Sequence, residues 1–424
     1  MYINRHIESA LESACKEKGV LCVTGARQVG KSTVLKKLFK DHKELTLDES
    51  RLLRLATEHP EEFFAQFEPP VFVDEIQYAP SLLPYIKIHI DKTGEKGAFV
   101  LSGSQKFEMI KGAVESLAGR INLIDLYGLS LREILGDDFC EKFLPTKEYL
   151  NKRKPKPIKY CEIWENIWRG FFPEIVVQGT NFEPASRGRL LEPTVSSGLW
   201  TRFYSSYLRT YLDRDVSKLG QVGNLLQFEK FMVAVAARTG QLVKIADLAK
   251  DTGISQQTAE KWLSILVASN IVYMLKPYYN NVLKRLVKSP KLYFLDTGLA
   301  SYLLGWDNPR VLQNGAMAGA FFETFVICEI IKSWTNNDGI TPNMNFFFYR
   351  DKDGNEIDLL IKKGGTIYPV EMKKHVNCSQ SDITAFSQLE KIPDIKRGEG
   401  CVVCMADDVL PITSTDRAVG VRYL

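Results

Sequence analysis

Short apolar runs alternate with helix-patterned stretches over the first third of the chain. The apolar, strand-like runs are 20–24, 44–48, 70–77, 97–101 and 121–126. Between them, residues 33–39 and 51–67 carry hydrophobic side chains at helical spacing. A helix is also expected before the first strand, because Ile7, Leu11 and Cys15 share one helical face. This alternation predicts an α/β core.

The middle of the chain begins with a polar stretch and continues with helical patterns. Residues 136–160 are rich in lysine, and the basic run 151–157 contains two prolines, so we expect a linker there rather than regular core elements. An apolar helical patch follows at 163–168. Aromatic side chains then recur every fourth position at Phe203, Tyr207 and Tyr211, which indicates a packed helix face.

Residues 242–263 have the pattern of a helix-turn-helix, with a turn at Gly253 and Ser255 as the cap of the second helix. The apolar run 271–275 would form the β-wing of a winged helix. The exposed positions of the second helix include an acid, Glu260, which phosphate would repel, so DNA contact and a role as lid or spacer both stay open. The wing would also include Tyr278 and Tyr279, with Lys284, Arg285, Lys288 and Lys291 adding positive charge nearby.

The last third of the chain predicts hairpins that bring three charged residues together. The runs 345–350 and 356–361 flank an Asp-Gly turn, and a Gly-Gly turn leads into 366–373. Asp358 can then lie beside Glu371 and Lys373, which share one face of their strand. The alternative is a solvated strand face with an intrastrand ion pair.

Composition bounds the class of protein. The chain has 424 residues, 45% hydrophobic and 25% charged, with a net charge of +4, so we expect several globular domains. We find no apolar run long enough for a membrane span and no signal-peptide pattern, which predicts a cytoplasmic protein without a membrane partner. The eight cysteines are scattered, and the one C-x-x-C at Cys401 and Cys404 lacks a second pair, so buried thiols are favoured over zinc.

The segment between the first strand and the next helix carries the clearest chemistry. Its glycines and its Lys-Ser pair have the spacing of a Walker A loop, whose backbone N–H groups bind phosphate. Lys31 would reach the β and γ oxygens of ATP, and Ser32 would ligate Mg²⁺. The nucleotide-binding residues are therefore predicted to be Gly25, Ala26, Arg27, Gln28, Val29, Gly30, Lys31, Ser32 and Thr33.

Two further strands end in polar residues that suit ATP hydrolysis. Asp74 and Glu75 close the third strand in a Walker B arrangement, in which Asp74 would hold Mg²⁺ and Glu75 would polarise the attacking water. Ser102 and Ser104 follow the next strand, where a sensor of the γ-phosphate would lie. An ordinary strand-to-helix cap is the alternative for either serine.

Four motifs in this order resemble the prokaryotic AAA ATPases (AAA_14 type) that carry a C-terminal DUF4143 region. The motifs lie at 24–32, 73–77, 101–104 and 117–120. The resemblance implies that Arg120 contacts the γ-phosphate, within the chain or across subunits. It also implies lid helices over the nucleotide near 163–173.

The C-terminal charges resemble the Asp and Glu-x-Lys layout of restriction-endonuclease-like (PD-(D/E)xK) nucleases. Asp358 and Glu371 would hold Mg²⁺, and Lys373 would orient a hydroxide or neutralise charge on the phosphate. Glu323 resembles the extra helical acid of that family and would be a third metal ligand. The expected domains are 1–135 (ATPase core), 136–199 (linker and lid), 200–292 (helices and winged helix) and 293–424 (nuclease-like α/β domain).

These patterns predict a cytoplasmic ATPase that couples its nucleotide state to a winged helix and a nuclease-like domain and acts on DNA. The alternative is an ATP-dependent regulatory switch whose nuclease-like domain only docks DNA or protein. A small-molecule kinase is a further rival, but the sequence indicates no acceptor pocket. A homo-oligomer or a partner protein is compatible with either of the first two hypotheses.

Overall fold

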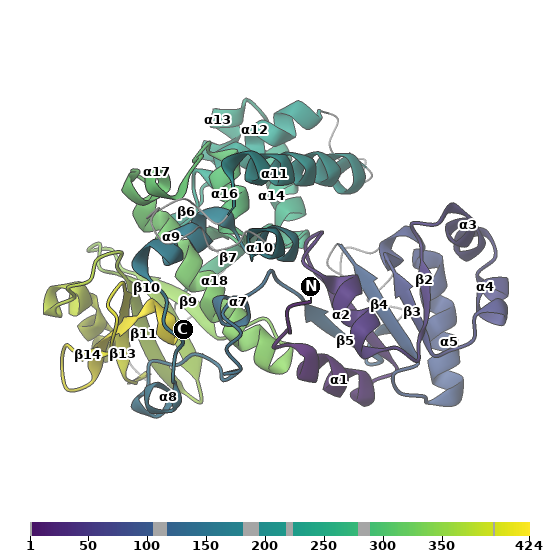
Figure 1. Ribbon diagram of the computed structural model, residues 1–424, viewed down its shortest axis with the longest axis horizontal. Helices are drawn as coiled ribbons and strands as arrows, with labels where there is room; N and C mark the ends of the chain where they lie inside the picture. The colour runs from purple at the N-terminus through teal and green to yellow at the C-terminus, as the bar shows by residue number, and fades with distance from the viewer. Residues whose placement is uncertain (1, 105–116, 181–194, 218–223, 279–288, 393–394) are drawn as a thin grey trace.

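The computed structural model describes residues 2–104, 117–180, 195–217, 224–278, 289–392 and 395–424. Figure 1 shows a smaller sheet with its helices on the right, a group of helices at the top and a larger sheet on the left. Tyr279, Lys284, Arg285 and Lys288, expected near the wing, lie outside the described residues. Among the helices described, none is both long and apolar enough to cross a membrane.

The first sheet has five parallel strands in the order β2-β3-β4-β1-β5. They are β1 (Val20–Thr24), β2 (Lys43–Thr46), β3 (Val71–Asp74), β4 (Phe99–Gly103) and β5 (Ile121–Asp125). Because all five run in one direction, their carboxyl ends meet at one edge, where ligands bind in open α/β sheets. This sheet confirms the predicted α/β core.

Helices cover both faces of this sheet. Alternate residues of β1 enter two separate cores: Leu21 and Val23 pack under α1 and α2, whereas Val20 and Cys22 face the other helices. The helices are α1 (Glu8–Glu17), α2 (Lys31–Leu38), α3 (Ser50–Glu58), α4 (Pro60–Gln66) and α5 (Leu83–Thr93). Every described residue of β1 is buried, which is why its sequence is a continuous apolar run.

Two expectations for secondary structure were wrong in detail. The helix predicted over 51–67 is two helices, α3 and α4, because Pro60 lacks an N–H and begins a new helix. The segment 136–160, expected as a linker, contains α8 (Lys147–Lys152) and packs into the core. Phe143 and Tyr149 are buried there, and the Tyr149 hydroxyl donates to the carbonyl of Tyr423 at 2.8 Å.

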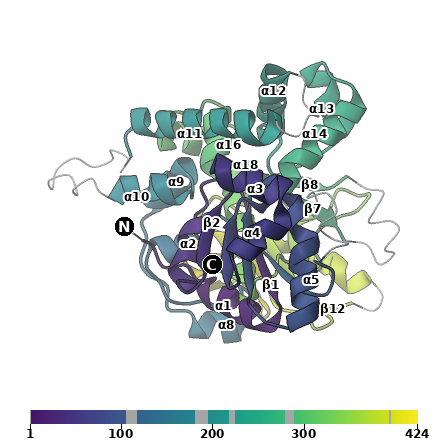
Figure 2. The same ribbon diagram turned by 90° about the vertical axis from the view of Figure 1, so that its right-hand side faces the viewer.

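A group of helices lies above the two sheets, and Figure 2 shows α11 running along its upper side. A short π-helical segment, Leu212–Val216, continues α11. The Gly253 turn and the Ser255 cap are present between α13 and α14. The remaining helices described for the chain are α7 (Leu131–Ile134), α9 (Tyr160–Arg169), α10 (Pro173–Thr180), α11 (Ser197–Tyr211), α12 (Leu225–Ala236), α13 (Ile245–Thr252), α14 (Gln256–Ala268), α16 (Thr297–Leu303), α17 (Pro309–Asn314) and α18 (Ala318–Asp338).

The second sheet has ten strands, nine of them in the order β14-β15-β13-β11-β10-β9-β7-β8-β6, with β12 paired to β11. They are β6 (Gln241–Leu242), β7 (Val272–Pro277), β8 (Lys291–Phe294), β9 (Phe346–Arg350), β10 (Glu356–Lys363), β11 (Thr366–Met372), β12 (Lys396–Arg397), β13 (Gly400–Cys404), β14 (Leu410–Pro411) and β15 (Asp416–Gly420). The predicted hairpins are present, and Gly364 and Gly365 turn between β10 and β11 with positive φ.

The strand expected as a wing is part of this larger sheet. β7 pairs antiparallel with β8 and parallel with β9, with Lys276 opposite Phe347. A single sheet therefore contains strands from both sides of the predicted boundary at 292/293.

Candidate functional site

The loop between β1 and α2 has the backbone that phosphate binding requires. Gly25 has a φ of 155°, and a Cβ there would overlap the carbonyl oxygen of Leu126. Gly30 precedes α2 with a left-handed φ of 93°. Only glycine adopts these conformations without strain, so the loop can wrap with its N–H groups at the head of α2.

Lys31 lies inside this loop. Its ammonium donates to the carbonyl oxygens of Gly25 at 2.9 Å and Ala26 at 3.0 Å. Burial lowers the pKa of Lys31, which nearby carboxylates oppose. Phosphate oxygens would offer this ammonium charged acceptors in place of neutral carbonyls.

Three polar side chains meet at the carboxyl ends of the neighbouring strands. The Ser32 hydroxyl donates to both carboxylate oxygens of Asp74, at 2.8 and 3.0 Å. Ser102, at the end of β4, also donates to Asp74. Hydroxyl and carboxylate oxygens are ligands that Mg²⁺ accepts, and phosphates and water commonly complete its shell. Ser32 and Asp74 therefore fit the expected Mg²⁺. Ser102 contacts Asp74, and its role as a sensor stays a prediction.

Glu75 follows Asp74 with a left-handed φ of 61°. This turn directs Glu75 to the side chains of Gln77, which donates to it, and Arg27, whose guanidinium is 3.7 Å away. Gln77 also donates to the hydroxyl of Ser104 at 3.1 Å. The predicted water activator thus lies between Arg27 of the phosphate loop and Gln77 of the turn that follows β3.

One acid of the helical region enters this site. Asp215, in the π-helical segment after α11, accepts two hydrogen bonds from Arg27, at 2.6 and 3.0 Å. Ser104 donates to the same carboxylate at 3.0 Å. Burial alone would lower the pKa of Arg27, but Asp215 and Glu75 raise it above its ordinary value. No local pattern in the sequence indicates that Asp215 lies here, because its partner Arg27 is 188 residues away.

A cavity of about 350 Å³ lies beside the phosphate loop. It is lined by Tyr2, Ile3, Arg5, Gly30, Thr33, Leu129, Pro173, Glu174, Val177 and Gln178. The wall opposite the loop is α10, close to the residues expected to form a lid over the nucleotide.

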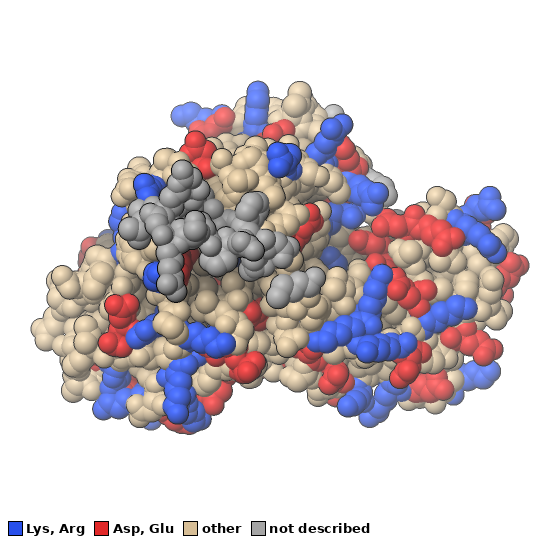
Figure 3. All heavy atoms as spheres, in the orientation of Figure 1, with Lys and Arg blue, Asp and Glu red and all other residues tan. Residues whose placement is uncertain are grey.

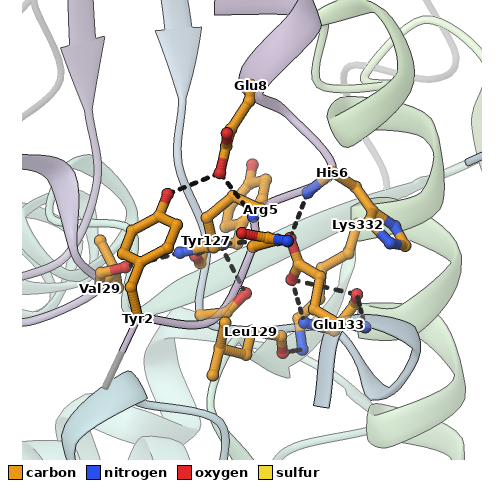
Figure 4. A network of polar contacts seen from close by, with 12 residues as sticks. Tyr2, Arg5, His6, Glu8, Val29, Tyr127, Leu129, Glu133 and Lys332 are labelled. Carbon is orange, nitrogen blue, oxygen red and sulfur yellow. Dashed lines mark hydrogen bonds and ion pairs between the residues drawn. The ribbon is translucent and has the colours of Figure 1, made fainter. Parts of the chain in front are cut away.

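Arg5 fixes the N-terminal wall of this cavity (Figure 4). Its guanidinium donates to the carbonyls of Val29 at 2.9 Å and Tyr127 at 2.7 Å, and to the Glu133 carboxylate at 3.1 Å. Glu133 also accepts the backbone N–H of His6 at 2.8 Å. The phosphate loop, β5 and α7 are therefore held by one buried arginine, which no local motif had indicated.

The expectation for Arg120 within its own chain is not met. Arg120 directly precedes β5, whose first residue, Ile121, pairs with Val20 at the start of β1. It thus lies at the amino edge of the parallel sheet, opposite the phosphate loop, and forms an ion pair with Asp91. A contact with the γ-phosphate of another subunit stays a prediction.

The C-terminal acids are present as a cluster, but a lysine lies among them. Lys291, on β8, is within 3.1 Å of Glu323, 2.6 Å of Glu356 and 3.2 Å of Asp358, and its side chain is 4% exposed. Burial would lower the pKa of Lys291, yet Asp358 and Glu323 raise it well above its usual range. Lys291, one of the basic residues expected to add charge near the wing, is instead a buried cation.

The other members of the cluster bond to each other. Glu371 accepts the backbone N–H of Asp358 at 3.2 Å and the ammonium of Lys373 at 3.2 Å. Burial and the nearby Asp358 carboxylate raise the pKa of Glu371 to about 8, and the same two causes raise that of Glu323 to about 7. Asp358 and Lys373 therefore lie beside Glu371, as the strand pattern predicted.

The predicted metal site at this cluster is not supported by the arrangement of its acids. Across the described ranges, no group of three or more His, Cys, Asp or Glu residues could hold a metal ion. Lys291 lies beside Glu323 and Asp358 and supplies positive charge to both carboxylates.

Comparison with known proteins gives relatives over nearly the whole chain. Uncharacterized protein Rv2008c of Mycobacterium tuberculosis and uncharacterized protein Mb2031c of Mycobacterium bovis are each 27% identical to it. The similarity extends over 424 residues, 99% of this chain and 84% of each relative.

Two solved structures align more distantly. The Walker-type ATPase PABY2304 of Pyrococcus abyssi gives a TM-score of 0.45 at 15% identity, covering 71% of this chain and 96% of its own. A signal transduction ATPase with numerous domains (STAND) from Pyrococcus horikoshii gives a TM-score of 0.27 at 10% identity, covering 81% of this chain and 49% of its own.

Three family models match parts of the chain. Residues 17–135 match an AAA domain (AAA_14), and residues 162–310 match a domain of unknown function (DUF8612). Residues 318–424 match another domain of unknown function (DUF4143). The resemblance suggested by the motifs is therefore confirmed: the chain contains an AAA domain (AAA_14) at residues 17–135 and a DUF4143 region at residues 318–424.

Proposed function

We propose that this chain binds ATP at the loop 25–33 and hydrolyses it. One observation carries the proposal: Ser32, from the head of α2, bonds to Asp74, from the end of β3, directly beside the buried Lys31. These three side chains are the Mg²⁺ and phosphate ligands of P-loop ATPases. The AAA-domain match of residues 17–135 supports the same activity.

The nucleobase would occupy the cavity between the N-terminal segment and α10. Its volume of about 350 Å³ lies in the range of small-ligand pockets, and Gly30 and Thr33 connect it to the phosphate loop. Apolar side chains such as Ile3 and Val177 suit the faces of a purine, and Glu174 and Gln178 offer polar atoms for its edge.

The phosphates would extend from this cavity along the loop. Lys31 would exchange its carbonyl partners for phosphate oxygens, and the N–H groups at the head of α2 would bind the β-phosphate. Mg²⁺, held by Ser32 and Asp74, would supply positive charge to the β and γ oxygens. Glu75 would accept a proton from the attacking water.

Phosphate release by Glu75→Gln tests this assignment. The variant should bind ATP as tightly as the wild type but lose at least about 99% of its hydrolysis, since a general base contributes 10²–10⁴-fold. Glu68→Gln, at an exposed position before β3, is the matched control and should hydrolyse normally. Failure of the wild type to bind ATP, or undiminished hydrolysis by Glu75→Gln, would contradict the proposal.

We infer that the C-terminal region is a docking element controlled by the nucleotide, rather than a metal-dependent nuclease. Lys291 supports this choice, because its ammonium supplies the charge that a metal would bring to Glu323 and Asp358. Incubation with plasmid DNA, ATP and Mg²⁺ or Mn²⁺ should leave the DNA intact. Cleavage that disappears in Lys373→Ala would instead establish the nuclease.

DNA is a candidate partner of the helix-turn-helix pattern that contains α14. The exposed positions of α14 are Gln256, Gln257, Glu260, Lys261 and Ser264, which present one charge of each sign. Figure 3 likewise shows basic and acidic side chains intermixed on the face drawn. Nonspecific DNA binding depends on clustered positive charge, so we expect weak binding that salt readily abolishes.

A further inference from the structure

Asp215 is a buried carboxylate of the helical region that lies inside the ATPase site. It is 3% exposed, and both arms of the Arg27 guanidinium and the Ser104 hydroxyl donate to it. The neighbouring Arg214 donates to Asp48, which follows β2, at 3.4 Å. The segment Leu212–Val216 is thus attached to the ATPase core at two points.

The donors that bind Asp215 face the γ-phosphate end of the site. Arg27 belongs to the phosphate loop, and its guanidinium is 3.7 Å from Glu75, the residue placed to activate the attacking water. Ser104 bonds to Gln77, which also donates to Glu75. Since the attacking water must lie next to the γ-phosphate, Arg27 and Ser104 border the same position.

These donors also have the chemistry that a phosphate would select. A planar guanidinium makes two parallel bonds to a carboxylate or a phosphate with similar geometry. A serine hydroxyl adds a third donor without discriminating between the two anions. Asp215 therefore presents to Arg27 and Ser104 the kind of anionic oxygens that the terminal phosphate of ATP would bring.

We propose that Asp215 determines nucleotide specificity by competing with the γ-phosphate of ATP for Arg27 and Ser104. The proposal rests on the proposed ATPase function. ADP lacks the competing phosphate and leaves the Arg27–Asp215 pair intact. ATP replaces one anion with another, so Arg27 stays paired while Asp215 is released.

Because Asp215 lies in the helical region, its release from Arg27 would alter the contact between that region and the ATPase core. The segment Leu212–Val216 is π-helical, a geometry that is rare and is found frequently at functional sites. It directly continues α11, so release of Asp215 would remove the buried one of the two attachments between the end of that helix and the ATPase core. ATP, but not ADP, would thereby change the contact between the two regions.

Nucleotide affinity of the full-length protein tests the proposal. Calorimetry would compare Mg²⁺ with ADP and Mg²⁺ with AMP-PNP, a non-hydrolysable ATP analogue. Asp215→Asn keeps the size of the side chain and removes its charge, so it should tighten AMP-PNP binding about tenfold and leave ADP binding within about twofold. Asp213→Asn is the matched control, because Asp213 is exposed on the same segment, and it should change neither affinity.

The ratio of the two affinities separates this role from a purely structural ion pair. Weaker AMP-PNP binding by Asp215→Asn, or an equal change for both nucleotides, would overturn the proposal while the ATPase assignment stands. A wild type that binds neither nucleotide would overturn the ATPase assignment, and this proposal with it.

A measurement on the wild type decides the question even if Asp215→Asn does not fold. Trypsin can cleave after Arg214 once its segment leaves the ATPase core, and the Arg214 side chain is half-exposed. We expect faster cleavage at Arg214 with AMP-PNP than with ADP. Equal cleavage rates with the two nucleotides would overturn the proposal.

Discussion

Each candidate site contains a buried charge whose counter-ion comes from a distant part of the chain. Arg27 pairs with Asp215, and Lys291 pairs with Glu323 and Asp358. Removing one partner of a buried ion pair is much costlier than breaking a surface pair, because the remaining charge stays out of water. Single substitutions at these positions should therefore have large, specific effects.

Lys291→Met tests whether this lysine takes the place of a metal. The variant leaves Glu323, Glu356 and Asp358 without their shared cation, so we expect a loss of stability of about 3 kcal/mol or more. Mn²⁺ should then raise the melting temperature of the variant, since a divalent cation can neutralise the freed carboxylates. Thermal unfolding with and without Mn²⁺ measures both effects.

The matched control is Lys276→Met, which changes an exposed lysine on the adjacent strand β7. It should unfold like the wild type and show no gain from Mn²⁺ beyond that of the wild type. If Mn²⁺ already stabilises the wild type as strongly as Lys291→Met, the acid cluster binds metal with Lys291 in place and our interpretation is wrong.

Gly25→Ala tests the steric requirement of the phosphate loop. The new methyl group would overlap the carbonyl oxygen of Leu126, whereas a methyl group added at Gly119, also at positive φ, would have no atom within 4 Å. Gly119→Ala should cost about 1 kcal/mol, the ordinary penalty of a left-handed conformation, and Gly25→Ala at least about 2 kcal/mol more. Denaturant unfolding of both variants gives the comparison, and equal costs would refute the steric explanation.

Residue types and their local spacing were enough to predict part of the first site. Ser32 and Asp74 follow from a loop and a strand end that a parallel sheet brings together. Arg5 and Asp215 could not be predicted in this way, because their partners lie 128 and 188 residues away in the sequence. The position of Lys291 is equally non-local, since only the folded sheet places β8 beside the acids of β10.

At the scale of elements, α7 joins the ATPase core to the rest of the chain. Glu133 completes a capping box with Ser130 at the start of α7 and accepts Arg5 from the N-terminal segment. Leu131 donates its N–H to Glu329 of α18 at 2.8 Å. A helix of one turn is marginal alone, so these bonds to other elements decide whether it forms.

Glu133→Gln should destabilise the protein by about 3 kcal/mol at neutral pH, because it leaves the Arg5 guanidinium buried without its anion. Glu148→Gln, at a side chain 80% exposed on α8, is the control and should change stability by less than about 0.5 kcal/mol. Urea unfolding measures the difference, and similar stabilities for the two variants would contradict the role given to Glu133.

The ion pair of Arg5 and Glu133 also predicts how the stability of the protein depends on pH. Burial by itself would raise the pKa of Glu133, but Arg5 and the backbone donors hold it below its ordinary value of 4.5. A lowered pKa gives stability that is present above about pH 4.5 and is lost as the pH falls through the lower value. The stability gap between wild type and Glu133→Gln should therefore narrow in acid, and a gap that widened would refute this assignment.

Local patterns predicted most helices and strands, but they missed the helix α8 and the break between α3 and α4. The strand-like runs became β1 to β5, and the Gly-Gly turn became the β10–β11 hairpin. The packing of the segment that contains Phe143 and α8 was missed, because lysines outnumber its buried residues. The partners of Phe143 and Tyr149 lie far away in the sequence, in α18 and at Tyr423. Helical periodicity likewise did not reveal that Pro60 separates α3 from α4.

At the scale of the whole molecule, Asp125 at the end of β5 joins all three parts. It accepts hydrogen bonds from Thr24 at 2.7 Å, from Asn270 at 3.0 Å and from Thr341 at 3.1 Å. These donors belong to the ATPase sheet, the helical region and the segment before β9. Asp125 therefore connects the carboxyl edge of the first sheet directly to the other two parts, so a movement at this edge would reach both of them.

The larger sheet could not be predicted from local patterns, because its strands β7 and β9 pair although they are about seventy residues apart in the sequence. Lys276 and Pro277 of β7 lie opposite Phe347 and Phe348 of β9. Parallel pairing of this kind leaves no turn motif between the two strands. The sequence instead suggested a separate wing and a boundary near residue 292.

A separate domain that begins at residue 293 and a continuous sheet that includes β7 and β8 predict different behaviour for isolated fragments. A fragment of residues 293–424 lacks Lys291 and leaves the β9 edge unpaired, so we expect it to aggregate. A fragment of residues 224–424 contains every described strand of the larger sheet together with Lys291, and should be more soluble and show a cooperative thermal transition. Analytical ultracentrifugation and circular dichroism distinguish the two. A monomeric, cooperatively folded 293–424 fragment would show that the C-terminal acids need neither β7 nor Lys291, and would restore the separate domain that the sequence suggested.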